Sequence, residues 1–474
     1  MYRVHCASAG AFHSDKTINV SDALSGIVRR ILAVAVIVIL ASAIGAVAFS
    51  LSGGGQVTST SEGVGGKSSS STSQIETGAT STALSTVSIS NSTGLSSLEV
   101  ASANLGGYLN NPVLDSNAGL IYGLSFSQGI QGNSNTLLTA INTSSLAART
   151  VLTLPGTGLA IAVDVKTDTI YVSILGCVEG IQTPNSCSSN PSGFFDQEIL
   201  RVNGSTGVIE GRTPVQTNES FIGVDPNTDT LYAIQSCPHA DISSPCGRLL
   251  AFNATTGSLA QNLTVKAGLN GLVVDPETGM VYSQGGWNLP ASQSNGGHTL
   301  GIVAFRYLPP SLKVAFEAPL NTTNAIDLSV DAVTNVVYGF ADNESSADLF
   351  AINGATGSVL FSSVVGTACS LYDSQEGSAA TPEGATVDTS TNQVYLNTNQ
   401  GESTLVAVDG TTGQVVGMLP APSPIDNSLF DSQSARLFVF LESGTVAAVP
   451  SAVMVGGVDS ALLNPSCPVI IPEG

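Results

Sequence analysis

Histidine, tryptophan and basic residues are scarce in this sequence. Its 474 residues include four His, one Trp and 14 Lys or Arg, against 35 Asp or Glu, and the formal net charge is -21. Nucleic acid and anionic membrane surfaces are excluded as binding partners, because both require clustered positive charge. We interpret the acidity as a means of keeping a Ser- and Gly-rich surface soluble. The alternative is a bound cation or a partner with a basic face.

Patterns typical of catalysis and metal binding are also missing. The sequence contains no GxSxG, HExxH, P-loop or EF-hand pattern. No cysteine pair has CxxC spacing, and only His239 and His298 follow the first hundred residues, so zinc is not expected. We therefore predict no catalytic residue, no metal site and no cofactor.

A short pattern recurs seven times, and VVDPETGMVY at 273–282 is one copy. In each copy an Asp is followed seven positions later by an aromatic residue: Asp115/Tyr122, Asp164/Tyr171, Asp225/Tyr232, Asp275/Tyr282, Asp331/Tyr338, Asp388/Tyr395 and Asp431/Phe438. Asp opens a turn by bonding its own backbone, and Gly279 supplies a positive φ. The residues that follow favour a strand. Each copy predicts strand, tight turn and strand, with a structural role for the Asp and the aromatic.

A second pattern follows each copy of the first, as in LLAFNATTG from Leu249 and LVAVDGTTG from Leu405. An apolar strand runs into a turn opened by Asn or Asp, and another strand follows. Repeated units of four short strands are typical of propeller blades. We predict an all-β fold with a seven-bladed β-propeller at 99–458. LEVASANLGG at 98–107 is predicted to complete the last blade beside GTVAAVP and so remove free edges.

Repeats such as VVDPETGMVY followed by LLAFNATTGSL resemble the YVTN-type seven-bladed propellers of surface-layer and extracellular proteins. The resemblance covers about residues 99–458. It implies the fold and an extracellular setting. It does not imply one activity, because propellers serve as binding modules, scaffolds and enzymes.

An uncharged apolar run at 31–51 is long enough to span a membrane as a helix. Arg29 and Arg30 precede it, and the next basic residue after it is Lys67. The positive-inside rule then predicts a single-pass plasma-membrane protein with residues 1–30 in the cytoplasm and the propeller outside.

Two alternatives to this signal anchor remain. Small residues at 41–43 or 46–48 fit a signal-peptidase site. The stretch at 22–51 also resembles the amino terminus of archaeal type IV pilin-like proteins, with cleavage after Ala23 and a filament-forming helix.

Residues 52–98 are rich in Ser, Thr and Gly. Because such a segment cannot bury a core, we predict a disordered linker of roughly 40 Å end-to-end distance. Its composition also suits O-glycosylation. Residues 459–474 form a C-terminal tail.

Six cysteines follow the apolar run, and six cysteines allow 15 pairings. Proximity in sequence favours disulfides between Cys177 and Cys187 and between Cys237 and Cys246, which leaves Cys369 with Cys467. Disulfides persist in oxidising compartments, which agrees with export.

Eight Asn-X-Ser/Thr sequences are candidates for N-glycosylation: Asn91, Asn142, Asn203, Asn218, Asn253, Asn262, Asn321 and Asn343. Several coincide with predicted turns, where Asn is also ordinary turn chemistry. Trp287 falls in a predicted insertion and is a candidate recognition residue. His298 nearby is the one candidate general base, and a solvated loop His is the favoured interpretation.

The sequence thus favours a tethered binding, adhesion or structural module of the cell envelope, with an unknown envelope protein or glycan as partner. The predicted recognition loops are the insertions at 173–198, 234–248, 284–300 and 367–384. The alternatives are a propeller enzyme, either a lactonase-like hydrolase or a quinoprotein-like oxidoreductase, and a pilin-like filament subunit.

Overall fold

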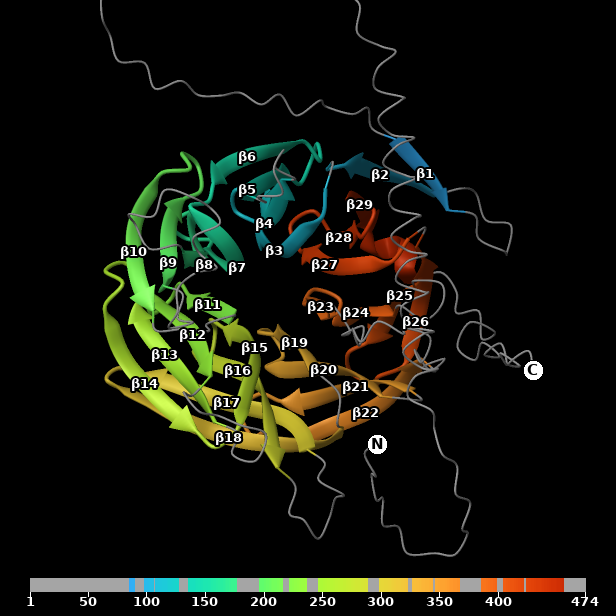
Figure 1. Ribbon diagram of the computed structural model, residues 1–474. Coiled ribbons are helices and arrows are strands. Elements are labelled where there is room, and N and C mark those ends of the chain that lie inside the picture. Colours follow the sequence, from blue (N-terminus) through green and yellow to red (C-terminus); the bar gives the residue numbers. More distant parts are fainter. Residues whose placement is uncertain are drawn as a thin grey trace, which may run out of the picture. The chain divides into compact units, whose positions relative to one another are not determined.

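A computed structural model shows seven antiparallel sheets arranged as blades around a central axis (Figure 1). It describes residues 85–89, 98–105, 107–127, 135–176, 196–215, 221–236, 246–288, 298–322, 326–343, 346–366, 385–398, 404–421 and 423–455. The predicted all-β seven-bladed propeller is confirmed. The predicted membrane helix at 31–51 and most of the linker at 52–98 lie outside the described residues.

Blades 1 to 4 each contain four strands in sequence order. Blade 1 consists of β3 (Leu109–Asp115), β4 (Leu120–Ser127), β5 (Asn135–Asn142) and β6 (Ala148–Thr153). Blade 2 consists of β7 (Gly156–Asp164), β8 (Thr169–Gly176), β9 (Asp196–Asn203) and β10 (Ile209–Val215). Blade 3 consists of β11 (Phe221–Asp225), β12 (Thr230–Ser236), β13 (Gly247–Asn253) and β14 (Leu259–Val265). Blade 4 consists of β15 (Gly268–Asp275), β16 (Met280–Asn288), β17 (His298–Leu308) and β18 (Ser311–Thr322).

Blades 5 and 6 repeat this order, and blade 7 combines both ends of the propeller. Blade 5 consists of β19 (Ile326–Asp331), β20 (Val336–Asn343), β21 (Ser346–Asn353) and β22 (Val359–Gly366). Blade 6 consists of β23 (Ala385–Asp388), β24 (Gln393–Thr398), β25 (Thr404–Asp409) and β26 (Val415–Pro420). Blade 7 consists of β27 (Ile425–Asp431), β28 (Arg436–Leu441), β29 (Thr445–Pro450), β2 (Leu98–Asn104) and β1 (Ser85–Ile89). A 3-10 helix, η2 (Ser451–Val455), follows β29.

The ring is closed by β2, which pairs with β29 from Ala101 opposite Ala448 to Asn104 opposite Thr445. This is the closure that the sequence predicted. Residues 85–89, within the segment expected to be a linker, form β1, which pairs along the outer edge of β2 as a fifth strand. Its sequence, STVSI, contains three β-branched residues, which suit a strand despite the Ser- and Thr-rich composition.

Blade-to-blade packing forms the core. Seven clusters of buried apolar side chains lie between neighbouring blades. The cluster at the closure joins Phe438 and Val446 of blade 7 to Ile121 and Ile141 of blade 1. The seven aromatics of the repeat are all buried at such junctions, and the first strands lie nearest the axis (Figure 1).

The seven repeated Asp residues end the first strand of each blade and are all buried. Each accepts a backbone N–H from the turn, as when Asn227 N donates to Asp225 Oδ1 at 2.8 Å. In five blades a hydroxyl three positions later donates to Oδ2 at 2.6 to 2.8 Å, from Thr167, Thr228, Thr278, Thr391 and Ser434. The Asp therefore holds the turn in shape.

Blade 1 lacks that hydroxyl. The residue three positions after Asp115 is Ala118, whose N–H donates to Oδ1 at 3.0 Å. Asp115 Oδ2 is buried with no hydrogen-bond partner among the described residues. Burial raises the pKa of the Asp115 carboxyl, and the negative charge of Asp168 adds to that rise.

The residue four positions after each repeated Asp has a positive φ, as Asn392 (53°) does in blade 6. Tyr338 of blade 5 reaches across to this turn. Its Oη bonds with the Gly410 carbonyl oxygen at 3.0 Å and Asn392 Oδ1 at 3.1 Å. A Cβ at Gly410 would lie 2.4 Å from Tyr338 Oη and 2.5 Å from Asn392 Oδ1. A polar side chain at the left-handed position therefore requires a small residue at the facing position of the next turn.

The same exchange recurs around the ring. An Asp or Asn in the left-handed position faces Gly or Ala in Asp168/Gly204, Asp229/Ala254, Asn335/Gly354 and Asn392/Gly410. At two junctions the small residue, Gly119 or Ala435, occupies the positive-φ position instead. The residue that faces it, Thr143 or Ser451, then carries the polar side chain. Thr143 Oγ1 donates to the Gly119 carbonyl at 3.1 Å in blade 1. The repeat aromatic at the junction of blades 7 and 1 is Phe438, which has no hydroxyl. Each of these junctions thus holds one polar side chain.

Candidate recognition surface

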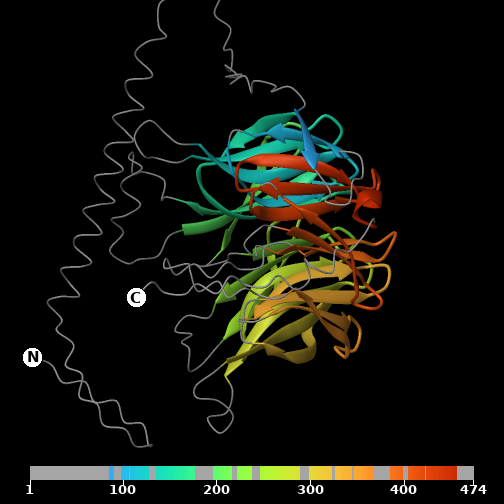
Figure 2. The same ribbon diagram turned by 90° about the vertical axis from the view of Figure 1, so that its right-hand side faces the viewer.

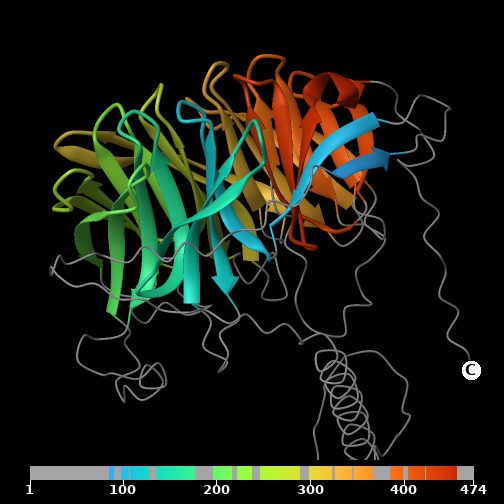
Figure 3. The same ribbon diagram turned by 90° about the horizontal axis from the view of Figure 1, so that it is seen from above.

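The antiparallel order of each blade gives the propeller two unlike faces. The first-to-second and third-to-fourth connections are short hydrogen-bonded turns, and they lie on one side of the ring, here called the turn face (Figure 3). The second-to-third and blade-to-blade connections must begin and end on the opposite side, the loop face, because consecutive strands reverse direction. The two sides are seen edge-on in Figure 2.

All four predicted insertions belong to the loop face. Three connect second and third strands, after Gly176, Ser236 and Asn288, and the fourth connects β22 to β23. The segments between these strand ends lie outside the described residues. Their origin on one face means that the long connections of four blades leave the same side of the propeller.

The insertion of blade 4 is shorter than predicted. Residues 284–288 continue β16, and 298–300 already belong to β17, with Asn288 opposite His298. Trp287 is therefore a strand residue and not a loop residue. It is half-buried against the core cluster between blades 3 and 4, and a Cβ at Gly285 would lie 2.7 Å from its ring. SQGGWN and the start of HTLGI, predicted to lie in one insertion, form the lengthened ends of β16 and β17.

The predicted disulfides lie almost entirely outside the described residues. Cys246, which stands directly before β13, is disulfide-bonded. The other five cysteines after the apolar run fall in segments that the structure does not describe, so the three pairings stay predictions.

The predicted glycosylation sites fall into two structural groups. Asn142, Asn203 and Asn253 open third-to-fourth turns, where each Oδ1 accepts a backbone N–H at 2.7 to 3.0 Å. Asn262 is exposed on the outer strand β14. Asn321 and Asn343 lie in β18 and β20, whereas Asn91 and Asn218 are outside the described residues.

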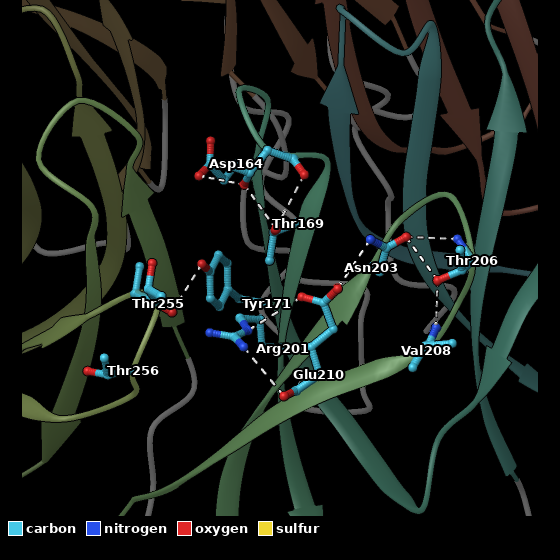
Figure 4. A network of polar contacts seen from close by, with 12 residues as sticks. Asp164, Thr169, Tyr171, Arg201, Asn203, Thr206, Val208, Glu210, Thr255 and Thr256 are labelled. Atoms are coloured by element: carbon cyan, nitrogen blue, oxygen red, sulfur yellow. Dashed lines mark hydrogen bonds and ion pairs between the residues drawn. The ribbon is translucent and has the colours of Figure 1, made fainter.

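Polar side chains of the turn face are occupied by bonds within the propeller. In Figure 4 Asn203 accepts from Thr206 N at 2.9 Å and donates to Glu210 at 3.2 Å, while Arg201 contacts the same Glu210 at 3.7 Å. Tyr171 donates to the Ala254 carbonyl at 3.3 Å, and burial raises its pKa to about 12. The polar groups of this face form hydrogen bonds within the turns and across the blade junctions.

The axial channel carries few acidic groups. On the described first strands, apart from the repeated Asp residues, the carboxylates are Asp327 and Asp426. Asp327 accepts from Leu328 N at 2.9 Å and Ala385 N at 2.8 Å, and Asp426 accepts from Tyr108 Oη. Both therefore bridge backbone or side chains of neighbouring elements. Within the described ranges, no group of three or more His, Cys, Asp or Glu residues is placed to hold a metal ion.

No helix in the described part of the chain is long and apolar enough to cross a membrane. Membrane attachment therefore stays a prediction from the sequence at 31–51.

Comparison with known proteins identifies the fold and nothing finer. No family model matches the chain, and no curated protein sequence matches it. A solved chain of a mitotic checkpoint complex is 10% identical, with a TM-score of 0.51, and the match covers 74% of this chain and 93% of that one. A chain of Kuenenia stuttgartiensis hydrazine synthase is also 10% identical, with a TM-score of 0.51, over 74% of this chain and 97% of that one. The seven-bladed propeller is shown, and membership of the YVTN-type family stays a prediction.

Proposed function

We propose that this chain is a membrane-tethered extracellular propeller that binds a protein or glycan of the cell envelope through its loop face. The observation that carries the proposal is the collection of the long connections of four blades on one side of the ring. Binding residues are concentrated in loops held by a rigid scaffold, and here the scaffold is a closed ring.

The opposite face supports this division of labour. Its turns are short, and their Asp, Asn, Thr and Ser side chains bond within the fold. A surface whose polar groups are already paired gains little from a polar partner. The loop-face connections differ in length and sequence from blade to blade. One of them ends at Cys246, which is disulfide-bonded and directly precedes β13. A disulfide there lowers the cost of ordering the connection on binding.

The anchor and linker complete the proposal. A helix at 31–51 would hold the chain at the membrane, and the linker after it would extend roughly 40 Å. Tethering raises the effective concentration of the propeller for partners on the same surface.

Two loop deletions test the proposal without disturbing the blades. Gly176 is opposite Asp196 and Asn288 is opposite His298, so a two-residue Asn-Gly turn can replace 177–195 or 289–297. The first deletion removes Cys177 and Cys187 together and leaves no odd thiol. The full-length chain in liposomes should sediment with isolated envelope material, and either deletion should weaken this at least tenfold.

Turn-face variants provide the matched control. Val333 is 74% exposed in the first turn of blade 5, and Glu277 lies at the same position of the blade 4 turn. The variants Val333→Lys and Glu277→Lys should both sediment with envelope material as the wild type does. Equal binding by the loop deletions and the wild type would contradict the proposal, and hydrolytic or redox turnover would move the protein to the enzyme class.

A further inference from the structure

The outermost strand of each blade exposes one unpaired backbone edge, which invites pairing with another chain. Proteins protect such edges with charged residues or with a covering segment. Three blades carry charges on the outer strand: Arg149 on β6, Glu210 and Arg212 on β10, and Lys313 and Glu317 on β18. The outer edge of blade 7 is covered by β1.

Blade 5 has neither protection. Its outer strand β22 reads VLFSSVVG, without a charge. Val359, Leu360 and Val364 are 50%, 53% and 62% exposed, which makes three of the eight large apolar residues that are exposed in the described part of the chain. No other described strand holds more than one of the eight. Within the described part of the chain, this edge is therefore apolar, uncharged and unpaired.

The two faces of β22 alternate as a strand requires. Phe361, Ser363 and Val365 face blade 6, where Ser363 Oγ donates to the Gly413 carbonyl at 2.7 Å. Leu360, Ser362 and Val364 form the exposed face.

Equivalent residues in the uncharged fourth strands of blades 3 and 6 differ from this exposed face. In blade 3 they are Ala260, Asn262 and Thr264, which are small or polar. In blade 6, Val416 and Met418 are half-buried. Among the fourth strands of blades 1 to 6, β22 alone combines no charge with an apolar exposed face.

The end of the described chain lies on the neighbouring blade. In η2, Met454 packs into the core between blades 6 and 7, and its carbonyl oxygen would be 1.4 Å from a Cβ at Gly417 of β26. Nineteen residues follow Val455, and they include the uncharged run PVII at 468–471. The 14 residue steps from Val455 to Val469 can span about 46 Å at roughly 3.3 Å each, whereas packed sheets lie about 10 Å apart.

We propose that residues 469–471 pair antiparallel with the free edge of β22 as a fifth strand of blade 5. The chain already uses this device once, because β1 pairs with β2 over five residues at the edge of blade 7. Val469, Ile470 and Ile471 are β-branched and match the apolar exposed face.

The cysteine positions agree with this direction. Cys369 stands three positions after the end of β22, and Cys467 stands two before Val469. The predicted disulfide between Cys369 and Cys467 would hold Cys467 near the end of β22. The residues after Cys467 would then run antiparallel to β22.

Hydrogen exchange in the full-length chain tests the proposal. A chain ending at Ser466 and a Val364→Asp variant should both exchange the β22 amides that do not pair with β21 at least tenfold faster than the wild type. Val364→Asp should also remove protection of the amides at 469–471. The matched control is Thr264→Asp at the equivalent position of β14, which should leave both segments unchanged.

Equal exchange of β22 in the wild type and the truncated chain would overturn the proposal. Protection of β22 that survives truncation and rises with protein concentration would also overturn it, because the occupant would then be a second copy. Val364→Asp replaces an exposed side chain, so folding is retained, and a melting curve verifies this for each variant.

Discussion

Replacing Ala118 by Thr should stabilise the propeller. Blade 1 has Ala118 where five other blades place a hydroxyl that donates to the turn carboxylate, and Asp115 Oδ2 is buried without a partner among the described residues. Asp331 Oδ2 of blade 5 is likewise without a partner among them, although Thr334 stands at that position. Ala118 is exposed, so a larger side chain fits. A hydrogen bond to a charged group contributes about 1.5–3 kcal/mol, and ordering the Thr side chain costs a few tenths to ~1 kcal/mol. We expect a net gain of about 1–2 kcal/mol.

The assay is thermal unfolding of the full-length chain, with a midpoint expected to rise by roughly 1–3 °C. Ala118→Val is the matched control, since it adds the same bulk without the hydroxyl. The effect should depend on pH with a definite sign. Burial raises the Asp115 pKa, and the new hydroxyl favours the ionised carboxylate. The gain should therefore be full well above that raised pKa and shrink as the pH falls through it. Equal midpoints for the Thr and Val variants at pH 7 would show that the added hydroxyl does not stabilise the Asp115 turn.

Three further predictions concern blade junctions, turn strain and ring closure. Tyr338→Phe removes a buried hydroxyl that bonds Gly410 O and Asn392 Oδ1, and it should cost about 1–3 kcal/mol in urea unfolding; a loss below about 0.5 kcal/mol would show that the hydroxyl contributes little. Ala435→Gly should stabilise by up to about 1 kcal/mol, because Ala435 has a φ of 51° that Gly adopts without strain; a lower melting midpoint would count against this. Deleting residues 98–107 removes β2 and should lower the midpoint by about 10 °C or more; an unchanged melt would mean that the ring does not depend on this strand.

The fold was predictable because the same hairpin pattern recurs seven times in the sequence. The spacing from Asp275 to Tyr282 specifies a hairpin, and six further copies specify its multiplication. Closure by residues 98–107 also followed, since a strand-like pattern before the first repeat matches the one strand that blade 7 lacks. β1 escaped prediction because its Ser-rich surroundings have the composition of a linker, and short strands at a sheet edge leave a weak signal.

The pairing of one polar and one small residue at each of these blade junctions could not be predicted from a single repeat. It joins the aromatic of one blade to two turns of the next, so it depends on contacts such as Tyr338 with Gly410, which are 72 positions apart. A signal was nevertheless present, because Asp168 and Asn392 accompany Gly204 and Gly410, whereas Gly119 accompanies Thr143. The gathering of insertions on one face was also derivable from strand parity. The position of Trp287 was not, because two Gly residues disguised a continuing strand.

The measurement that tests the central claim most directly is hydrogen exchange of the full-length chain with and without isolated envelope material. Binding should slow exchange in the loop-face connections at 177–195, 237–245, 289–297 and 367–384, and it should leave turn amides such as Lys166 N and Asn227 N unaffected. Protection of the turn face, or no change anywhere despite binding, would contradict the claim that the loop face is the recognition surface.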